Sequence, residues 1–152
     1  MIKRLEGAVG ALRIDTDGAV AVVPWPEEHA ERRDVVCSAV GGFPDEAVYH
    51  RRASLHVHGS GQSEGLPLNL SAWVLASIWR GMEIPYGVYG PAVVTGPQLA
   101  GLDEDLEGAV QAACAAVAEV RLEWVTRPPV GELQARAELL AAARHAMSAF
   151  IA

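Results

Sequence analysis

The sequence predicts an α+β protein. We expect a small mixed, mainly antiparallel sheet of about five strands with two packed helices, plus a C-terminal αα-hairpin. Short apolar segments separated by turn residues fill residues 1–97, as expected for strands and their connections. From 98 to 152 the apolar residues recur every three or four positions, which is typical of helices. We therefore expect a core over 1–97 and a helical hairpin over 98–152, packed as a single compact unit.

The composition restricts the class of protein. The chain has 152 residues, of which 51% are hydrophobic and 20% charged, as in soluble globular domains. Its net charge of −7 and its single lysine, Lys3, argue against nucleic acid as a partner, because that binding needs a cationic surface. No apolar run approaches the roughly 20 residues of a membrane span, and the start of the chain lacks the features of a secretory signal. We expect a location in the cytoplasm of a bacterial host cell and no membrane partner.

The first elements are a strand pair and a helix. In ALRIDTDGAVAVVPW, residues 11–25, two apolar segments flank Asp17 and Gly18, and the glycine supplies the positive φ that a tight turn needs. A helix follows from Pro26, since proline suits a first helical turn. The glycine pair at 41–42 ends this helix.

Two strand candidates and a second helix follow. The strands are DEAVYHR, 45–51, and ASLHVHG, 53–59, and the residues between them are too poor in turn formers to predict a hairpin. The helix LSAWVLASIWR, 70–80, has Asn69 as a possible N-cap and Gly81 as a possible end. It is apolar nearly all round, so we expect it to be buried or to line a groove.

One strand and two helices complete the chain. Val93 and Val94 form a continuous apolar run, which suits a central strand covered on both faces. A long helix begins near Asp103, two prolines in TRPPVG stop it, and a second helix runs from Glu132 onward. The apolar stripe of the first helix comprises Leu106, Val110, Ala113, Val117, Val120 and Trp124, and that of the second comprises Leu133, Leu140, Met147 and Ile151.

Both C-terminal helices are apolar beyond these stripes, which predicts self-association. Leu122, Leu139 and Phe150 lie off the stripes, and in water such side chains would form a larger apolar patch than monomers usually expose. A two-fold homodimer that pairs the hairpins would bury this surface. Alternatively, the helix 70–80 or a different protein covers it. The expected interface residues are Leu133, Leu140 and Met147.

Three histidines form a candidate metal site. His56 and His58 are two positions apart on a predicted strand, so their side chains point to the same face. His50 lies on the strand before, and converging imidazoles can hold zinc or another first-row ion. The spacing is generic, and hydrogen-bonded strand histidines are the alternative. A metal-dependent enzyme at these residues is therefore one candidate function, whereas the leading hypothesis below needs no cofactor.

A glycine-rich loop precedes the Trp-bearing helix. Gly59, Gly61 and Gly65 match neither the dinucleotide fingerprint nor the P-loop. The residues LPLN separate the last glycine from the helix, whereas a phosphate cradle presents the helix N-terminus directly to the anion. A flexible loop is therefore favoured. The alternative is a small-ligand or nucleotide-binding protein that uses this loop with Arg51 or Arg80.

Four aromatic residues form a candidate partner-binding surface. Trp73 and Trp79 are six positions apart on one helix, so they point away from each other and one of them belongs to the core. The other, with Tyr86 and Tyr89, can form an exposed aromatic patch of the kind that binds partners. The alternative is a helix enclosed between the sheet and the C-terminal hairpin.

Three motifs resemble a known family. VGG at 40–42, GLPLN at 65–69 and YGPAVVTG at 89–96 resemble, in this order, DUF3846, a family of small domains common in bacteriophages and mobile elements, including those of actinobacteria. The resemblance covers residues 11–96 and implies a strand pair, a helix ending near two glycines, two strands, a turn and a last strand. The family has no established activity, so no catalytic residues carry over, and the Trp-rich helix and the C-terminal hairpin depart from its pattern. The residues that match the turn are Gly65, Pro67 and Asn69.

The leading hypothesis is a non-enzymatic accessory protein of a phage or mobile element. It would act through protein–protein interaction, in host takeover or counter-defence. No serine lies in a nucleophile elbow, neither cysteine has a catalytic signature, and capping explains the carboxylates at helix starts. The surplus of aromatic residues on one helix favours a protein partner.

Overall fold

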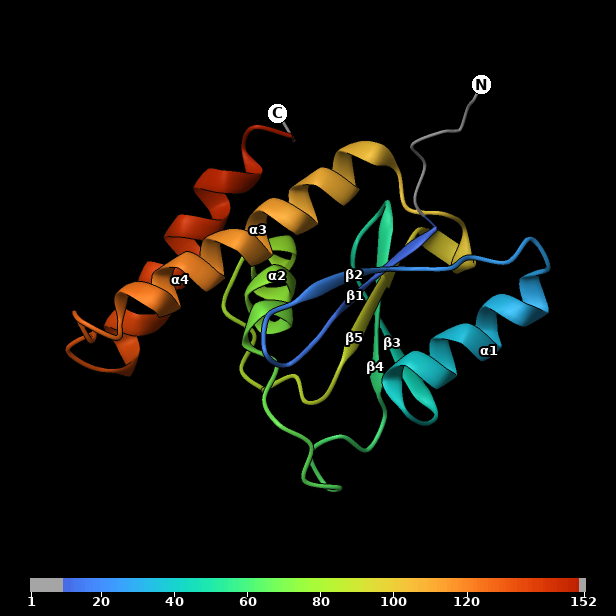
Figure 1. Ribbon diagram of the computed structural model, residues 1–152, viewed down its shortest axis with the longest axis horizontal. Coiled ribbons are helices and arrows are strands. Elements are labelled where there is room, and N and C mark those ends of the chain that lie inside the picture. The colour runs from blue at the N-terminus through green and yellow to red at the C-terminus, as the bar shows by residue number, and fades with distance from the viewer. Residues whose placement is uncertain (1–9, 151–152) are drawn as a thin grey trace.

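The computed structural model describes residues 10–150 and has the predicted α+β fold (Figure 1). Five strands form one sheet in the order β2-β1-β5-β4-β3, and every neighbouring pair of described strands is antiparallel. In chain order the elements are β1 (Ala11–Ile14), β2 (Val20–Val23), α1 (His29–Val40), β3 (Pro44–His50), β4 (Ala53–His58), α2 (Leu70–Arg80), β5 (Ala92–Thr95), the short 3-10 helix η1 (Pro97–Leu99), α3 (Glu104–Glu123) and α4 (Glu132–Met147).

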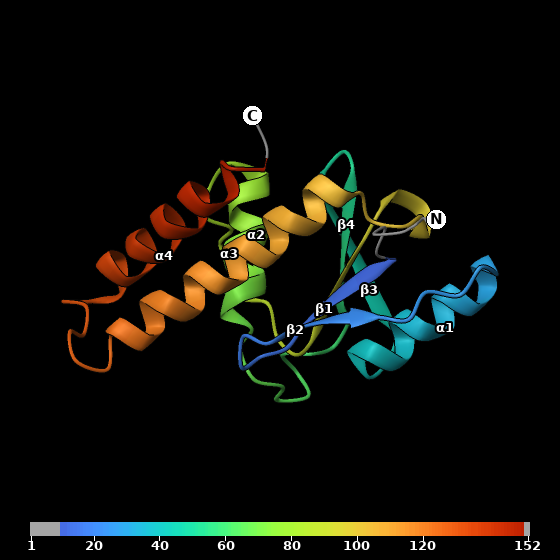
Figure 2. The same ribbon diagram turned by 45° about the horizontal axis from the view of Figure 1, so that its top comes forward.

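Helices cover both faces of the sheet. The helix α1 packs on one face, α2 and α3 pack on the other, and α4 lies against α2 and α3 (Figures 1 and 2). Because side chains alternate along a strand, Leu12 and Ile14 of β1 face α2 and α3, whereas Ala11 faces α1. One continuous cluster of buried side chains runs from the sheet through α2 to the C-terminal helices. The hairpin is therefore part of the main core.

The strand predictions are confirmed. β1 and β2 pair around the turn at Asp17 and Gly18, and Gly18 has the positive φ of 95° that the turn requires. β5 is the central strand and its four residues are buried. β3 and β4 form the hairpin that the sequence left open, with a register irregularity between Ala47 and His50. The turn itself consists of Arg51 and Arg52, neither of which is a typical turn residue.

The predicted ends of α2 are also confirmed. The side chain of Asn69 accepts a hydrogen bond from the Ala72 N–H, and Gly81 ends the helix in the left-handed conformation with φ of 84°. The residues from Ser71 to Ser77 are all buried, as expected for a helix that is apolar on every side. The helix is enclosed by the sheet, α3 and α4.

Asn69 joins three segments of the chain. Its Nδ2 donates to the carbonyl oxygens of Ile14, at 2.9 Å, and Gly90, at 3.0 Å. Its backbone N–H donates to the Val88 carbonyl at 2.7 Å, and its Oδ1 accepts from Ala72 as the helix cap. The residue is fully buried. It thereby fixes the loop before β5 against the start of α2 and the end of β1.

The apolar stripe predicted for α4 is wrong in part. Leu133 is 73% exposed, whereas Leu139, which the prediction left off the stripe, is 1% exposed and packs in the core. The buried face is Leu139, Ala143 and Met147, which are four positions apart. Leu133 stands six positions before Leu139, which is about 120° around a helix of 3.6 residues per turn, so it lies off this face. Leu140 is half-buried against the core, and Ile151 lies outside the described residues.

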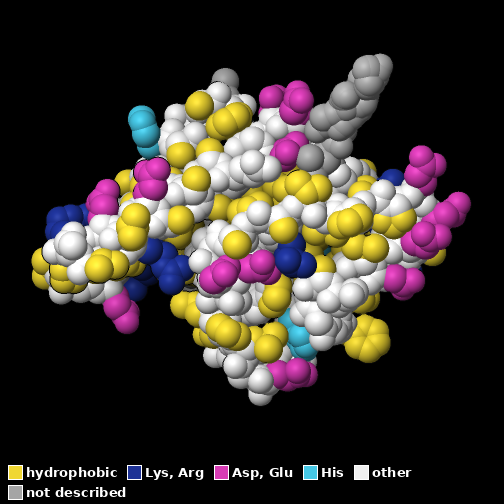
Figure 3. All heavy atoms as spheres, in the orientation of Figure 1, with side chains coloured by type: hydrophobic (Ala, Val, Ile, Leu, Met, Phe, Trp, Pro, Cys, Tyr) yellow, Lys and Arg dark blue, Asp and Glu magenta, His cyan; other side chains and the backbone are white. Residues whose placement is uncertain are grey.

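The outer end of the hairpin carries exposed apolar side chains. We call this surface the hairpin tip, and it lies where α3 ends and α4 begins (Figure 3). Its apolar residues are Leu122, Val125, Val130 and Leu133. In contrast, the stripe predicted for α3 is buried from Leu106 to Val120. None of the described helices combines the length and the apolar character that crossing a membrane requires.

Candidate functional site

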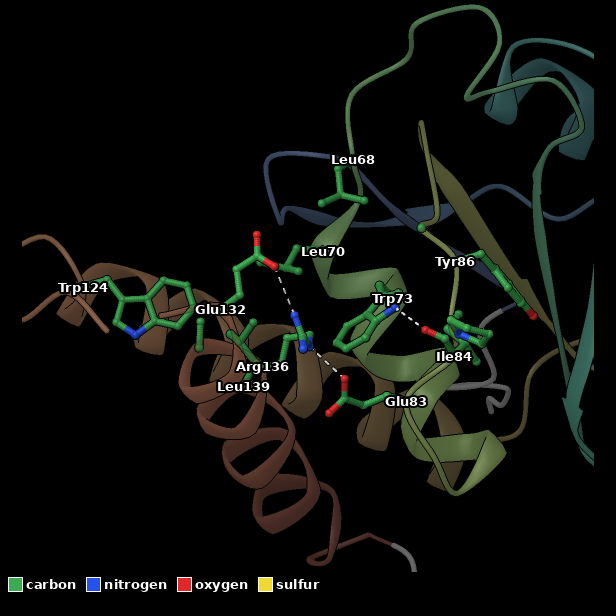
Figure 4. A pocket seen from close by; sticks show the side chains of 13 residues that line it. Leu68, Leu70, Trp73, Glu83, Ile84, Tyr86, Trp124, Glu132, Arg136 and Leu139 are labelled. Carbon is green, nitrogen blue, oxygen red and sulfur yellow. Dashed lines mark hydrogen bonds and ion pairs between the residues drawn. The ribbon is translucent and has the colours of Figure 1, made fainter. Parts of the chain in front are cut away.

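A groove lies between α2, α4 and the segment 82–87, with a volume of about 680 Å³ (Figure 4). We call it the α2–α4 groove. Its lining is mainly apolar and aromatic, and one charged trio crosses it. Its apolar and aromatic lining includes Leu68, Leu70, Trp73, Ile84, Tyr86, Trp124 and Leu139.

Trp73 connects the groove to the core. Its indole Nε1 donates to the carbonyl oxygen of Ile84 at 3.2 Å, and the hydroxyl of Ser77 accepts from the Ile84 N–H at 3.2 Å. The segment after α2 is therefore held against the helix through both the N–H and the carbonyl oxygen of one residue, Ile84. Since Trp73 is 7% exposed, only a small part of its ring reaches the groove surface.

Trp124, at the other end of the groove, is held by a polar network. Its Nε1 donates to Oε1 of Glu138 at 3.0 Å, and both Arg127 and Gln134 also donate to that carboxylate. The Arg127 guanidinium and the hydrogen bonds from Trp124 and Gln134 lower the pKa of Glu138 to about 2. The network joins the end of α3 to α4 and fixes the ring that closes the groove.

An arginine between two carboxylates supplies the charges of the groove. Nε of Arg136 lies 2.8 Å from Oε1 of Glu83, and its NH1 lies 3.4 Å from Oε1 of Glu132 (Figure 4). Glu83 follows α2 and the other two residues belong to α4, so the trio spans the groove. Two carboxylates outweigh one guanidinium, which leaves the groove acidic.

A second hollow, of about 340 Å³, lies between the β3–β4 hairpin and the segment 86–89. We call it the tyrosine hollow. Tyr49, Tyr86 and Tyr89 line it, together with Asp45, and the hydroxyls of Tyr49 and Tyr86 are hydrogen-bonded to each other. Burial, followed by the Tyr86 hydrogen bond, raises the pKa of Tyr49 to about 12. Tyr86 lines both this hollow and the α2–α4 groove.

The glycine-rich loop forms one end of the tyrosine hollow. A Cβ at Gly61 would lie 2.7 Å from the carbonyl oxygen of Tyr89, so only glycine fits there without a shift. Gly65 has a φ of 75°, and Gly59 and Gly61 both line the hollow. The loop therefore has a defined conformation and forms one wall of the tyrosine hollow.

The structure does not assemble the residues predicted to bind phosphate. Arg51 lies in the turn before β4, and the glycine loop follows the opposite end of that strand. Arg80 lies over the ring of Tyr49, with its Cζ 5.9 Å from the ring centroid. Around the loop, the charged neighbours include Glu64, whose carboxylate is 3.6 Å from Nε2 of His58. The carboxylates of Glu64 and Asp45 beside the loop repel an anion.

The three histidines do not converge on one site either. His56 and His58 do share a face of β4, as predicted, but His50 lies on the opposite face, where its ring is 5.5 Å from that of Trp79. His56 is buried and hydrogen-bonded to Thr95 at 3.0 Å, and burial lowers the pKa of its imidazole. Within residues 10–150, no three histidine, cysteine or acidic side chains are placed to hold a metal ion.

The four predicted aromatic residues are divided between sites. Trp73 and Tyr86 line the α2–α4 groove, and Tyr86 and Tyr89 line the tyrosine hollow. Trp79 lines a separate hollow of about 300 Å³ beside the end of α4. Trp73 is the core tryptophan that the six-residue spacing implied, and Trp79 is half-buried.

Sequence reasoning missed most of the groove. It did not single out Glu83, Arg136 or Trp124 as site residues, although Trp124 stood on the predicted stripe of α3. The pair of Glu132 and Arg136, four positions apart on a helix, was the one local signal available. The contact of Arg136 with Glu83 joins residues 53 positions apart, so no local pattern reveals it.

We compared the chain with protein-family models, with curated proteins and with solved structures, and none of the three comparisons gave a significant match. The resemblance to DUF3846 stays a prediction that rests on the three motifs alone.

Proposed function

We propose that this protein is a binding protein whose α2–α4 groove receives an amphipathic helical segment of another protein. The observation that carries the proposal is the groove itself, an apolar and aromatic channel with one charged trio across it. Grooves of this kind bind helices that present apolar residues on one face.

The surface around the groove favours a partner larger than a small molecule. A volume of about 680 Å³ falls within the range of small-molecule sites. However, Leu68 and Tyr86 line the groove and are also about half exposed, at 47% and 52%. The apolar surface thus extends from the groove onto its rim. A helix covers such a rim, whereas a compact ligand leaves it in water.

The resemblance to DUF3846 supports a setting for this function in bacteriophages or mobile elements. A protein that acts by binding a helix of its partner needs no catalytic residues. Interference with a host protein is the form of action that we propose for it, as host takeover or counter-defence.

A selection from a random library of helical peptides tests the proposal. Ala135 lines the groove from α4 and is half-buried, so the substitution Ala135→Trp fills the groove without replacing a core side chain. Peptides selected on the wild-type protein should bind this variant at least about tenfold more weakly, as measured by fluorescence polarisation. The matched control is Ala141→Trp, on the exposed face of α4, which should leave affinity unchanged.

Two results would contradict the proposal. One is a library that gives no peptide with micromolar affinity. The other is a set of peptides that bind Ala135→Trp as tightly as the wild type. Circular dichroism of both variants establishes that each is folded, so that a loss of binding reports on the groove.

A further inference from the structure

We propose that the tyrosine hollow receives a cationic side chain, preferably the guanidinium of an arginine, from the segment bound in the α2–α4 groove. The inference rests on the proposed function and names the chemistry of the partner: a helix with an apolar face and a basic residue beside it.

The two sites are adjacent. Tyr86 lines both of them, and the segment that carries it passes between the groove and the hollow. The hydroxyls of Tyr86 and Tyr49 meet at the edge of the hollow. A long side chain on a segment in the groove therefore needs only to pass the ring of Tyr86 to enter the tyrosine hollow.

The hollow attracts cations. The side chain of Asp45 lies on the same face of the sheet as the hollow, whereas Glu46 pairs with His56 and its side chain points to the other face. Among the described lining residues there is no lysine or arginine, and His58 is the only one with a titratable nitrogen. Aromatic rings attract cations through their negative faces, and a guanidinium also stacks flat on them. Three tyrosines with one carboxylate thus complement a guanidinium in both charge and shape.

Tyr89 is held in place by contacts with two glycines. A Cβ at Gly87 would lie 2.8 Å from the ring atoms of Tyr89, and a Cβ at Gly61 would lie 2.7 Å from the Tyr89 carbonyl oxygen. Tyr89 is therefore packed between two glycines, and its ring position is preorganised. Preorganised aromatic walls lower the entropic cost of binding.

The protein already uses a guanidinium on one of these rings. Arg80 lies over Tyr49 with its Cζ 5.9 Å from the ring centroid, within the range of a cation–π contact. Arg80 does not line the tyrosine hollow. The acidic groove next to it, where Glu83 and Glu132 outnumber Arg136, favours a basic partner as well.

A titration with a single amino acid derivative tests this inference directly. We expect N-acetyl-arginine methylamide to shift the backbone amide signals of Gly59, Gly61 and Gly87 in a ¹⁵N–¹H spectrum, with saturation at millimolar concentration. N-acetyl-citrulline methylamide has nearly the same shape without the charge, and its affinity should be lower by a factor of about five or more. Equal shifts from both probes, no shifts, or shifts confined to other residues would each overturn the inference.

A matched pair of variants locates the effect. Asp45→Asn removes a carboxylate of the hollow from an exposed edge position, and it should weaken arginine binding about threefold. Glu31→Gln removes an exposed carboxylate of α1, on the other side of the sheet, and should not change binding. Equal weakening by both variants would reduce the interaction to the net charge and reject the site.

The two proposals fail in different ways. If groove peptides bind but replacing their arginines by citrulline has no effect, the hollow does not take a cation and the proposed function stands. If the arginine derivative binds in the hollow but the library gives no groove peptide, the inference about the hollow stands and the proposed function fails.

Discussion

The buried side chain of Asn69 joins β1, α2 and the segment before β5. The chain order GLPLN predicted its role as a helix cap, and the structure adds two hydrogen bonds from Nδ2 to the carbonyls of Ile14 and Gly90. Because all of these groups are buried, a change at Nδ2 leaves two acceptors without donors. One residue thus determines where the wall of both cavities lies relative to α2.

We expect Asn69→Asp to lower the free energy of unfolding by about 3 kcal/mol, since the cap acceptor remains but two buried carbonyls then face a carboxylate. Urea unfolding followed by circular dichroism measures this. The control is Asp103→Asn, which keeps the cap oxygen that accepts from Leu106 at the less buried start of α3. It should cost less than about 1 kcal/mol. Equal losses would show that the Nδ2 bonds contribute nothing.

Glu138 predicts a pH dependence of stability. Its pKa is lowered to about 2 in the folded state by Arg127 and the other two donors, against an ordinary value of 4.5. A lowered pKa stabilises the fold above the ordinary value, and this contribution is lost as the pH falls toward 2. Glu138→Gln should therefore be less stable than the wild type at pH 6, with a difference that shrinks between pH 4.5 and 2. Thermal unfolding across this range measures it, and a difference that is independent of pH would contradict the prediction.

At the scale of the elements, α4 shows where a heptad-like interpretation fails. A spacing of seven placed Leu133 and Met147 on one stripe, whereas the spacing of four from Leu139 through Ala143 describes the face that is buried. We expect Leu139→Ala to cost about 3 kcal/mol of unfolding free energy, because the side chain is enclosed in the core. Leu133→Ala, at a position of the same helix that is exposed in the single chain, should change the stability of the monomer by less than about 0.5 kcal/mol.

Chemical denaturation of the two variants, at concentrations too low for the chain to pair, measures these values. A similar cost at both positions would contradict the exposed position of Leu133 in the single chain.

Self-association through the C-terminal helices stays a prediction. Of its three residues, Met147 is buried within one chain, Leu140 is half-buried, and Leu133 belongs to the exposed hairpin tip. Light scattering at micromolar concentration should give twice the mass of the chain. Leu133→Glu should return it to one chain, because it places a charge on the paired surface. A monomeric wild type would refute the dimer.

The elements of this fold were predictable because their signals are local. Each signal determines the structure of only the few residues next to it in the chain. Examples are the helix caps Asn69 and Asp103, the turn glycine Gly18 and the apolar run of β5. The site was not predictable for the opposite reason. Arg136 meets Glu83, and the glycine loop meets Tyr89, only after the sheet and the helices have packed. The three histidines show the same limit. The spacing along one strand predicts that His56 and His58 share a face, but it does not predict on which face of the sheet His50 of the neighbouring strand lies.

At the scale of the whole molecule, the two faces of the sheet are unequally covered. One core cluster extends through three helices, whereas the cluster under α1 has five buried residues: Ala11, Val23, Val36, Val40 and Val93. Half of the residues of α1 are exposed, and acidic side chains gather over its outer end (Figure 3). The residue before this helix, Glu28, forms no side-chain cap.

We therefore expect α1 to open before the rest of the protein. In native-state hydrogen exchange, the amides of α1 around Val36 and Val40 should exchange through a lower free energy of opening than those of α2. The reason is that few apolar contacts hold α1, whereas α2 is enclosed. Equal protection of the two helices would show that the molecule unfolds as one cooperative unit.

The position of Tyr86 in the wall of both cavities has a thermodynamic consequence. A ligand that changes the orientation of this ring changes the shape of the neighbouring cavity as well, so the two occupancies are linked. Linkage is reciprocal: if a helix in the groove strengthens the binding of arginine by some factor, arginine strengthens the binding of that helix by the same factor. A partner carrying both features would gain from this cooperativity, and a partner with only one of them would be discriminated against.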